Sequence, residues 1–109
     1  MTFIELPVFT ELITDLVDDA CYAQFQKELL RHPEKGDVMQ HAAGLRKMRL
    51  RLPGRGKSSG ARVIYLYLER HDTIVLFYVY TKARSENLTD GQLKRLRNAV
   101  VIIKQEFKP

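Results

Sequence analysis

Two segments near the middle of the chain place the strongest constraint on its fold. Residues 61–68 and 73–81 are rich in β-branched and aromatic residues and are apolar at almost every position. Apolar runs of this length are typical of strands that are buried on both faces. The four residues 69–72 between them suit a tight connection between antiparallel neighbours. The sequence therefore predicts that these two segments are the central strands of a sheet.

The N-terminal third predicts one short strand and two helices. Residues 2–6 alternate weakly and suit a strand. Pro7 suits the first turn of a helix whose apolar residues recur at helical spacing to about Val17. Asp18 is a good N-cap for a second helix. Pro33 limits this helix, because the residue before a proline avoids the helical region.

The hydrophobic period changes in the next part of the chain. Residues 34–37 predict a turn, and residues 45–52 alternate strictly as in a strand. Residues 53–60 are rich in Gly and Ser and predict a flexible hairpin loop. The alternation places basic side chains on one face, namely Lys47, Arg49 and Arg51. The other face then carries Arg46, Met48 and Leu50.

The chain ends in a predicted helix that begins with a capping box formed by Thr89 and Gln92. One apolar stripe of this helix consists of Leu93, Leu96, Val100, Ile103 and Phe107. The predicted order is β-α-α-β-β-β-α, an α+β fold with an antiparallel meander. A length of 109 residues fits one domain, residues 1–109.

Composition excludes several classes of protein. No apolar run approaches the roughly 20 residues that span a bilayer, so we expect no membrane contact. The first residues have no basic segment followed by an apolar one, so we expect a cytoplasmic protein. Cys21 is the only cysteine and has no internal disulfide partner. The sequence has no Cys/His ligand cluster, so we expect no metal site and no cofactor.

The net charge of +5 hides a strong asymmetry along the chain. Residues 1–40 carry three basic and eight acidic residues, whereas residues 41–109 carry 15 basic and five acidic residues. Seven of the basic residues, and no acidic ones, lie between Gly44 and Arg62. Such a charge distribution attracts polyanions, and nucleic acid or the ribosome is the first candidate partner. The alternative is a basic face that only serves solubility.

The common arrangements for hydrolytic catalysis are missing from the sequence. His32, His41 and His71 are isolated from one another. Ser58 and Ser59 have no His and Asp partners of a serine triad. The Gly54-x-Gly56-Lys57-Ser58 segment lacks the spacer and the following helix of a phosphate-binding loop.

A cationic cleft remains as the candidate site. In an antiparallel meander, Arg51, Arg62 and Lys82 converge near one edge, with Lys47 and Arg49 behind them along the strand. Arg84 lies close behind Lys82 in the sequence. Arginine matches phosphate oxygens with two parallel hydrogen bonds, and phosphoryl transfer needs mainly positioning and stabilisation of negative charge. Such a cleft suits RNA cleavage by the adjacent 2′-hydroxyl, and it equally suits binding without chemistry.

Three segments resemble the RelE superfamily of bacterial toxins: Gly44–Arg49, Gly60–Tyr65 and Tyr80–Leu88. They are most similar to its HigB branch, the toxin half of type II toxin–antitoxin pairs. The resemblance implies a small α+β domain of the microbial ribonuclease and RelE-like type. It also implies cleavage of messenger RNA in the ribosomal A site, which inhibits translation. The implied partner is a cognate, HigA-like antitoxin with a helix-turn-helix domain, which would connect the complex to operator DNA.

The resemblance also implies roles for individual residues. Lys47 and Arg49 would hold the scissile phosphate and help to accept the 2′-hydroxyl proton. Arg62 would stabilise the charge of the phosphorane, and Lys82 matches the basic residue after the last strand, with Arg84 as the nearby alternative. Leu88 stands where several members have a tyrosine, so the general acid stays unassigned. Further RNA contacts are predicted for Arg46, Arg51, Arg55, Lys57, Tyr80 and Arg84. The alternative is a non-catalytic protein of the same fold that binds RNA, the ribosome or a protein partner.

Overall fold

The computed structural model describes residues 1–52, 60–81 and 88–107. These residues form a five-stranded sheet and three α-helices, so the predicted α+β fold is confirmed. The strands are β1 (Thr2–Glu5), β2 (Asp37–Val38), β3 (Arg46–Leu50), β4 (Ala61–Leu68) and β5 (Thr73–Thr81). The helices are α1 (Pro7–Leu16), α2 (Asp19–Arg31) and α3 (Asp90–Glu106). None of these helices is long and apolar enough to cross a bilayer.

The helices begin where the sequence predicts, and in α2 and α3 side chains satisfy N–H groups of the first turn. Pro7 occupies the first turn of α1, where a missing N–H costs nothing. The Asp18 carboxylate accepts a hydrogen bond from the Cys21 backbone N–H at 2.8 Å. Thr89 and Gln92 form both hydrogen bonds of the predicted capping box of α3. These local signals explain why the helix starts are predictable from the sequence.

The strands lie in the order β1-β5-β4-β3-β2, so β5 and β4 are central, as the sequence predicts. β3, β4 and β5 form the predicted antiparallel meander, and β1 adds to β5 in parallel. The prediction that residues 34–37 form only a turn is wrong at its end. Asp37 begins β2, which pairs with the start of β3. A two-residue strand is too short to leave a periodic signal in the sequence.

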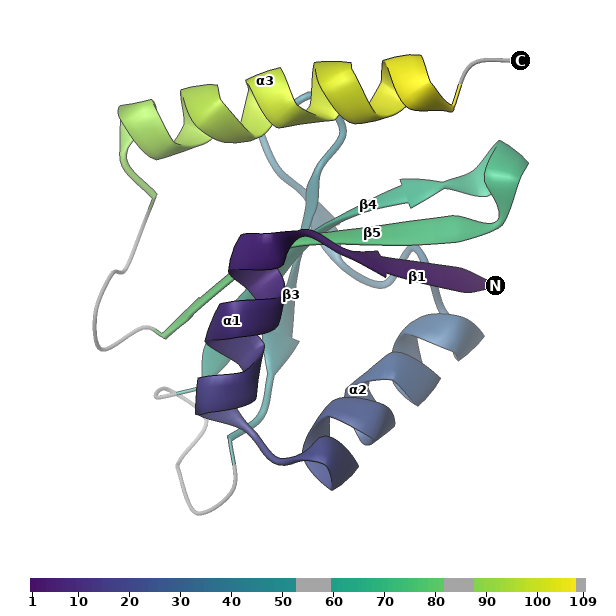
Figure 1. Ribbon diagram of the computed structural model, residues 1–109, viewed down its shortest axis with the longest axis vertical. Helices are drawn as coiled ribbons and strands as arrows, with labels where there is room; N and C mark the ends of the chain where they lie inside the picture. The colour runs from purple at the N-terminus through teal and green to yellow at the C-terminus, as the bar shows by residue number, and fades with distance from the viewer. Residues whose placement is uncertain (53–59, 82–87, 108–109) are drawn as a thin grey trace.

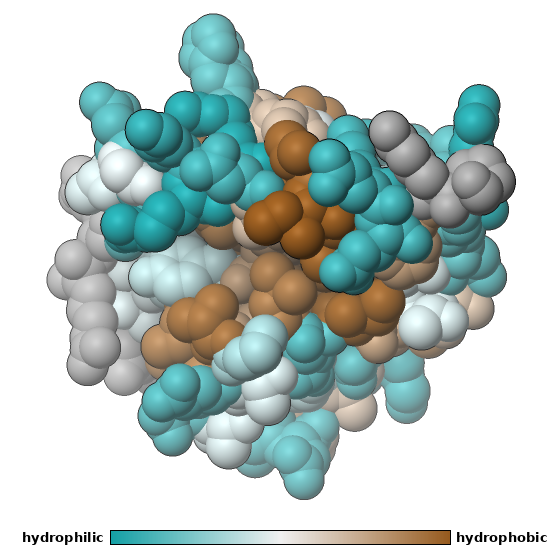
Figure 2. Space-filling model, turned by 45° about the horizontal axis from the view of Figure 1, so that its top comes forward, coloured by the Kyte–Doolittle hydropathy of each residue, from teal (hydrophilic) through white to brown (hydrophobic). Residues whose placement is uncertain are grey.

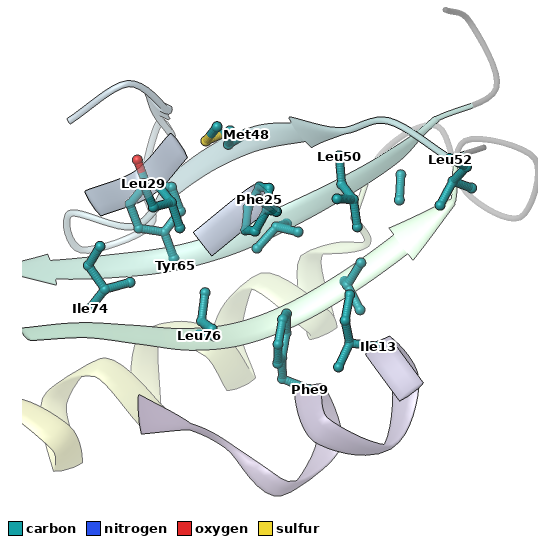
Figure 3. Close-up of a cluster of buried hydrophobic side chains, with 13 residues drawn as sticks. Phe9, Ile13, Phe25, Leu29, Met48, Leu50, Leu52, Tyr65, Ile74 and Leu76 are labelled. Carbon is teal, nitrogen blue, oxygen red and sulfur yellow. The ribbon is translucent and has the colours of Figure 1, made fainter. Parts of the chain in front are cut away.

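Helices cover the two faces of the sheet unequally. Figure 1 shows α1 and α2 on one side of the sheet and α3 on the other. On the α1/α2 face, Phe9 from α1 and Leu29 from α2 are fully buried against the strands. Figure 3 shows how side chains from both helices meet those of β3, β4 and β5. This cluster comprises Phe9, Ile13, Phe25, Leu29, Met48, Leu50, Leu52, Ala61, Val63, Tyr65, Ile74, Leu76 and Val79.

The α3 face has its own apolar cluster, in which Val100 of α3 packs on the central strands. Leu93, Leu96 and Ile103 join it as predicted, whereas the ring of Phe107 lies beside His71, with centroids 5.1 Å apart. Figure 2, with the α3 side turned toward the viewer, shows apolar side chains gathered between hydrophilic ones. A cavity of about 360 Å³ is lined by Leu6, Val8, Phe77, Tyr78, Gln92, Arg95, Leu96 and Ala99.

Candidate functional site

Strand pairing brings two arginines and a tyrosine into one row on the α3 face. Arg49 of β3 pairs directly with Arg62 of β4, and Arg62 pairs directly with Tyr80 of β5. Directly paired residues point to the same face of a sheet, with Cβ atoms roughly 4.5–5.5 Å apart. Tyr80 belongs to the α3-side cluster, which fixes the face on which the row lies. Arg49 is exposed and Arg62 is half-buried.

A second row runs beside the first. Lys47 of β3 pairs with Ile64 of β4, and Ile64 pairs with Tyr78 of β5. Lys47 lies two residues before Arg49 on the same strand, so both side chains share the α3 face. The sheet therefore brings together Lys47, Arg49 and Arg62, three of the four predicted catalytic residues. We call Lys47, Arg49, Arg62 and Tyr80 the cationic face.

The arrangement of charges on the cationic face does not serve folding. Two arginines directly opposite each other on neighbouring strands repel and destabilise a sheet. Among the described residues, no carboxylate lies within 4.0 Å of the charged nitrogens of Lys47, Arg49 or Arg62. The Arg62 guanidinium makes a hydrogen bond to the carbonyl oxygen of Ala61, at 3.2 Å. Phosphate oxygens suit such a set of donors, because guanidinium groups bind them bidentately.

Two cavities have Lys47 and Asp37 in their walls. The larger, of about 440 Å³, lies between the cationic face and the start of α3 and is lined by Asp37, Val38, Met39, Gln40, Lys47, Tyr80, Leu88 and Leu93. The smaller, of about 300 Å³, is lined by Glu28, Lys35, Gly36, Asp37, Lys47, Met48, Arg49 and Arg51. Both cavities lie directly beside the cationic face, because Lys47 is part of each wall.

A β-bulge places both Tyr78 and Tyr80 on the α3 face. Ile64 pairs with Tyr78 and Tyr65 pairs with Leu76, so Phe77 is an extra residue on β5. The rings of Tyr78 and Tyr80 stack, with centroids 6.0 Å apart and an interplanar angle of 26°. Burial raises the pKa of Tyr80, although the positive charge of Arg62 acts in the opposite direction. The phenol therefore stays protonated near neutral pH and is available as a hydrogen-bond donor.

The structure does not bring Arg46 to the cationic face. Its neighbour Met48 belongs to the α1/α2-side cluster, and Arg46 shares the face of Met48. The Arg46 guanidinium donates hydrogen bonds to the carbonyl oxygens of Glu34, at 3.0 Å, and Gly36, at 2.8 Å. Arg46 therefore holds the segment before β2 in place, and we leave it out of the RNA contacts.

The other predicted residues lie beside the cationic face or outside the described residues. Arg51 is exposed just after β3 and lines the smaller cavity together with Arg49. Arg62 pairs with Arg49 rather than with Arg51, so Arg51 lies one step beyond the row. The predictions for Arg55, Lys57, Lys82 and Arg84 concern residues outside the described part of the chain.

Two neighbours of the cationic face are not predicted from the sequence. Asp37 pairs directly with Lys47, which no pattern in the acidic N-terminal part of the chain indicates. Tyr78 reaches this face because of the bulge, which changes the alternation of β5. Its only signal is the pair of tyrosines two residues apart on a predicted strand.

Comparisons with known proteins identify the family of this chain and proteins of similar fold. Residues 27–106 match the family model described as the RelE toxin of the RelE/RelB toxin–antitoxin system. The fold is similar to that of a double mutant of the E. coli toxin RelE in the free state, with a TM-score of 0.56 and 17% identity over 78% of this chain and 86% of that chain. It is also similar to a chain of the intact E. coli RelBE toxin–antitoxin complex, with a TM-score of 0.52 and 15% identity over 72% and 92% of the two chains.

Proposed function

Because this chain belongs to the RelE family of toxins of toxin–antitoxin systems, we propose that it is a ribosome-dependent endoribonuclease. It cleaves messenger RNA in the ribosomal A site and thereby inhibits translation in the cytoplasm. Its placement in the HigB branch of the superfamily stays a prediction from sequence resemblance.

The observation that carries this proposal is the direct pairing of Arg49 with Arg62 beside Lys47. Folding alone disfavours three neighbouring cations, whereas a phosphodiester stabilises them. Attack of a ribose 2′-hydroxyl on the adjacent phosphate builds negative charge on the phosphate oxygens. Donors that are already in place stabilise this charge more in the transition state than in the ground state.

The proposed roles follow from the rows of the sheet. Lys47 and Arg49 hold the scissile phosphate from β3, and Arg62 stabilises the phosphorane from β4. Tyr80, protonated and adjacent to Arg62, donates a hydrogen bond to the bound RNA. We propose a metal-independent reaction because these cations supply the charge stabilisation. Lys82 completes the proposed catalytic set, with Arg51, Arg55, Lys57 and Arg84 as further RNA contacts.

We propose that a cognate antitoxin neutralises the protein, as the RelBE complex of E. coli pairs a toxin with an antitoxin. The basic segment from Gly44 to Arg62 attracts an acidic or shape-matched surface of this partner. A HigA-like antitoxin with a helix-turn-helix domain fits the sequence resemblance and would bring the complex to operator DNA. The test is co-expression with the product of the neighbouring gene. Binding that leaves growth arrest intact would contradict the proposed partner.

Purified protein on programmed ribosomes tests the proposed activity. Wild-type protein is added to ribosomes that carry messages with varied A-site codons, and the message ends are mapped by primer extension. The same message without ribosomes is the matched control. We expect cleavage only in the presence of ribosomes. No cleavage at any A-site codon, together with retained binding, would favour a non-catalytic protein that binds RNA, the ribosome or another protein.

A further inference from the structure

Asp37 lies beside the cationic face although it comes from the acidic part of the sequence. It is the first residue of β2 and pairs directly with Lys47. Directly paired residues share one face of a sheet, so the carboxylate of Asp37 and the side chain of Lys47 project on the same side. Asp37 is exposed and, within the described part of the chain, lines the two cavities of about 440 Å³ and 300 Å³ together with Lys47.

Side chains from the neighbouring strands hold the segment before Asp37. The Tyr65 hydroxyl of β4 donates a hydrogen bond to the carbonyl oxygen of Pro33, at 2.8 Å, and accepts one from the Gly36 N–H, at 2.9 Å. A Cβ atom at Gly36 would lie only 2.8 Å from the Tyr65 ring, so the backbone approaches this ring closely. Together with the two hydrogen bonds from Arg46, these contacts fix the position at which Asp37 enters the sheet.

The wall of the smaller cavity contains a second carboxylate, that of Glu28, which already has a cationic partner. Glu28 of α2 forms an ion pair with Lys35, and both line this cavity. Glu28 does not line the larger cavity, whereas Asp37 lines both. Among the described residues, Asp37 is therefore the carboxylate that lies next to Lys47 in the walls of both cavities.

The chemistry of the proposed cleavage needs a group that accepts a proton. A guanidinium and an ammonium carry no lone pair, and a phenol with a raised pKa stays protonated. The guanidinium groups of Arg49 and Arg62 and the phenol of Tyr80 are therefore donors, and the Lys47 ammonium accepts a proton only after it has released one. A carboxylate is an acceptor, and a positioned carboxylate is a common general base. Of the directly paired Asp37 and Lys47, the Asp37 carboxylate is the group that accepts a proton without first releasing one.

Resting on the proposed function, we propose that Asp37 is the general base of the cleavage reaction. Its carboxylate takes the proton from the 2′-hydroxyl as the 2′-oxygen forms a bond to phosphorus. The bond between phosphorus and the 5′-oxygen breaks, and the departing 5′-oxygen takes a proton from water. The products are a 2′,3′-cyclic phosphate and a 5′-hydroxyl, and the hydroxide left from water takes the proton back from Asp37.

The experiment compares D37N with E34Q in single-turnover cleavage on programmed ribosomes across a range of pH. Glu34 is an exposed acid of the same segment and lines neither cavity beside Lys47, so E34Q is the matched control. We expect D37N to slow cleavage by roughly 10²–10⁴-fold. The acidic limb of the pH–rate profile should disappear in D37N, because the group that must lose its proton is gone. Ribosome binding should not weaken, and E34Q should match the wild type.

Two further variants separate a general base from a structural residue. D37E keeps a carboxylate and should retain part of the activity. D37A should regain activity with increasing formate, which supplies a carboxylate from solution. A slow D37N that keeps its acidic limb, with no rescue of D37A by formate, would overturn the proposal in favour of positioning. D37N protein that cuts at the wild-type rate would overturn it while leaving the proposed function intact. A wild type that cuts no ribosome-bound message would overturn both.

Discussion

The same strands make both faces of this sheet, yet only the α3 face carries the directly paired charges of Arg49 and Arg62. On the α1/α2 face, β3 contributes Met48 and Leu50, and two helices cover them. On the α3 face, the same strand contributes Lys47 and Arg49. One helix covers the apolar part of that face, where Val100 is buried. The difference shows how one alternating strand serves both a core and a charged surface.

The comparison also shows where the molecule tolerates unfavourable interactions. The charged row of the α3 face places like charges opposite each other, which lowers the stability of the sheet. The α1/α2 face contains no such conflict among the described residues, and its Phe9 and Leu29 are completely buried. We infer that the α1/α2 face supplies stability and that the open part of the α3 face supplies function. Substitutions on the two faces should therefore have different consequences.

The largest effect on stability is expected for Phe9→Ala, on the covered face. Phe9 is 0% exposed, so its removal leaves a cavity and should lower the free energy of unfolding by about 3–5 kcal/mol. Urea unfolding measures this change. The cleavage rate per folded molecule should stay at the wild-type value, because Phe9 does not touch the cationic face. A lower cleavage rate at temperatures where the variant is fully folded would contradict the assignment of stability and function to different faces.

A smaller effect separates the two sides of α3. Ile103 packs against the α3-side cluster and is half-buried, whereas its neighbour Ile102 is 57% exposed. Ile103→Ala should lower the free energy of unfolding by about 2 kcal/mol, the low end for such a change because the residue is not fully buried. Ile102→Ala is the matched control and should change it by less than about 0.5 kcal/mol. Equal losses in denaturant melts would mean that α3 does not rest on the sheet through this stripe.

The smallest effect concerns pH and the buried tyrosines of the two faces. Burial raises the pKa of Tyr22 on the α1/α2 face, and a hydrogen bond to Glu5 raises it further. Burial also raises the pKa of Tyr80, but the charge of Arg62 opposes this shift. A raised folded-state pKa gives stability that is complete below the unfolded value of about 10 and is lost as the pH rises above it.

Unfolding by urea between pH 8 and pH 11 measures this loss. The free energy of unfolding of the wild type should fall above about pH 10, where unfolded tyrosines lose their protons. Tyr22→Phe should flatten this fall, and Tyr80→Phe should flatten it less because of Arg62. If Tyr80→Phe reduces the fall of the free energy of unfolding more than Tyr22→Phe does, the causes assigned to the two pKa shifts are wrong.

Much of the fold follows from local patterns in the sequence. Alternation in residues 45–52 places Lys47 and Arg49 on one face, and the two apolar segments specify the centre of the sheet. The helix starts follow from Pro7, Asp18 and Thr89, whose effects act within one turn. These features depend on neighbours in the chain, so they are predictable without the structure.

The remaining parts depend on contacts between distant segments. β2 has two residues, and it exists because Tyr65 and Arg46 hold the segment before it against the sheet. The sequence predicts an RNA contact for Arg46, since it does not show that the carbonyl oxygens of Glu34 and Gly36 lie within reach of this side chain. Tyr78 faces the cationic side because of a bulge, which no local pattern of β5 indicates. Asp37 lies beside Lys47 because it is the first residue of β2.

The most direct test of the central claim, that the open part of the α3 face carries the chemistry, is cleavage by Arg62→Ala on programmed ribosomes. Arg62 is half-buried at the start of β4, whereas Arg70 is exposed in the 3₁₀ turn Glu69–His71 at the opposite end of that strand. Arg62→Ala should slow cleavage by roughly 10²–10³-fold without unfolding the protein, the usual loss for one donor to a charged transition state. Arg70→Ala should cleave at the wild-type rate. Folded Arg62→Ala protein that cuts as fast as the wild type would contradict the claim.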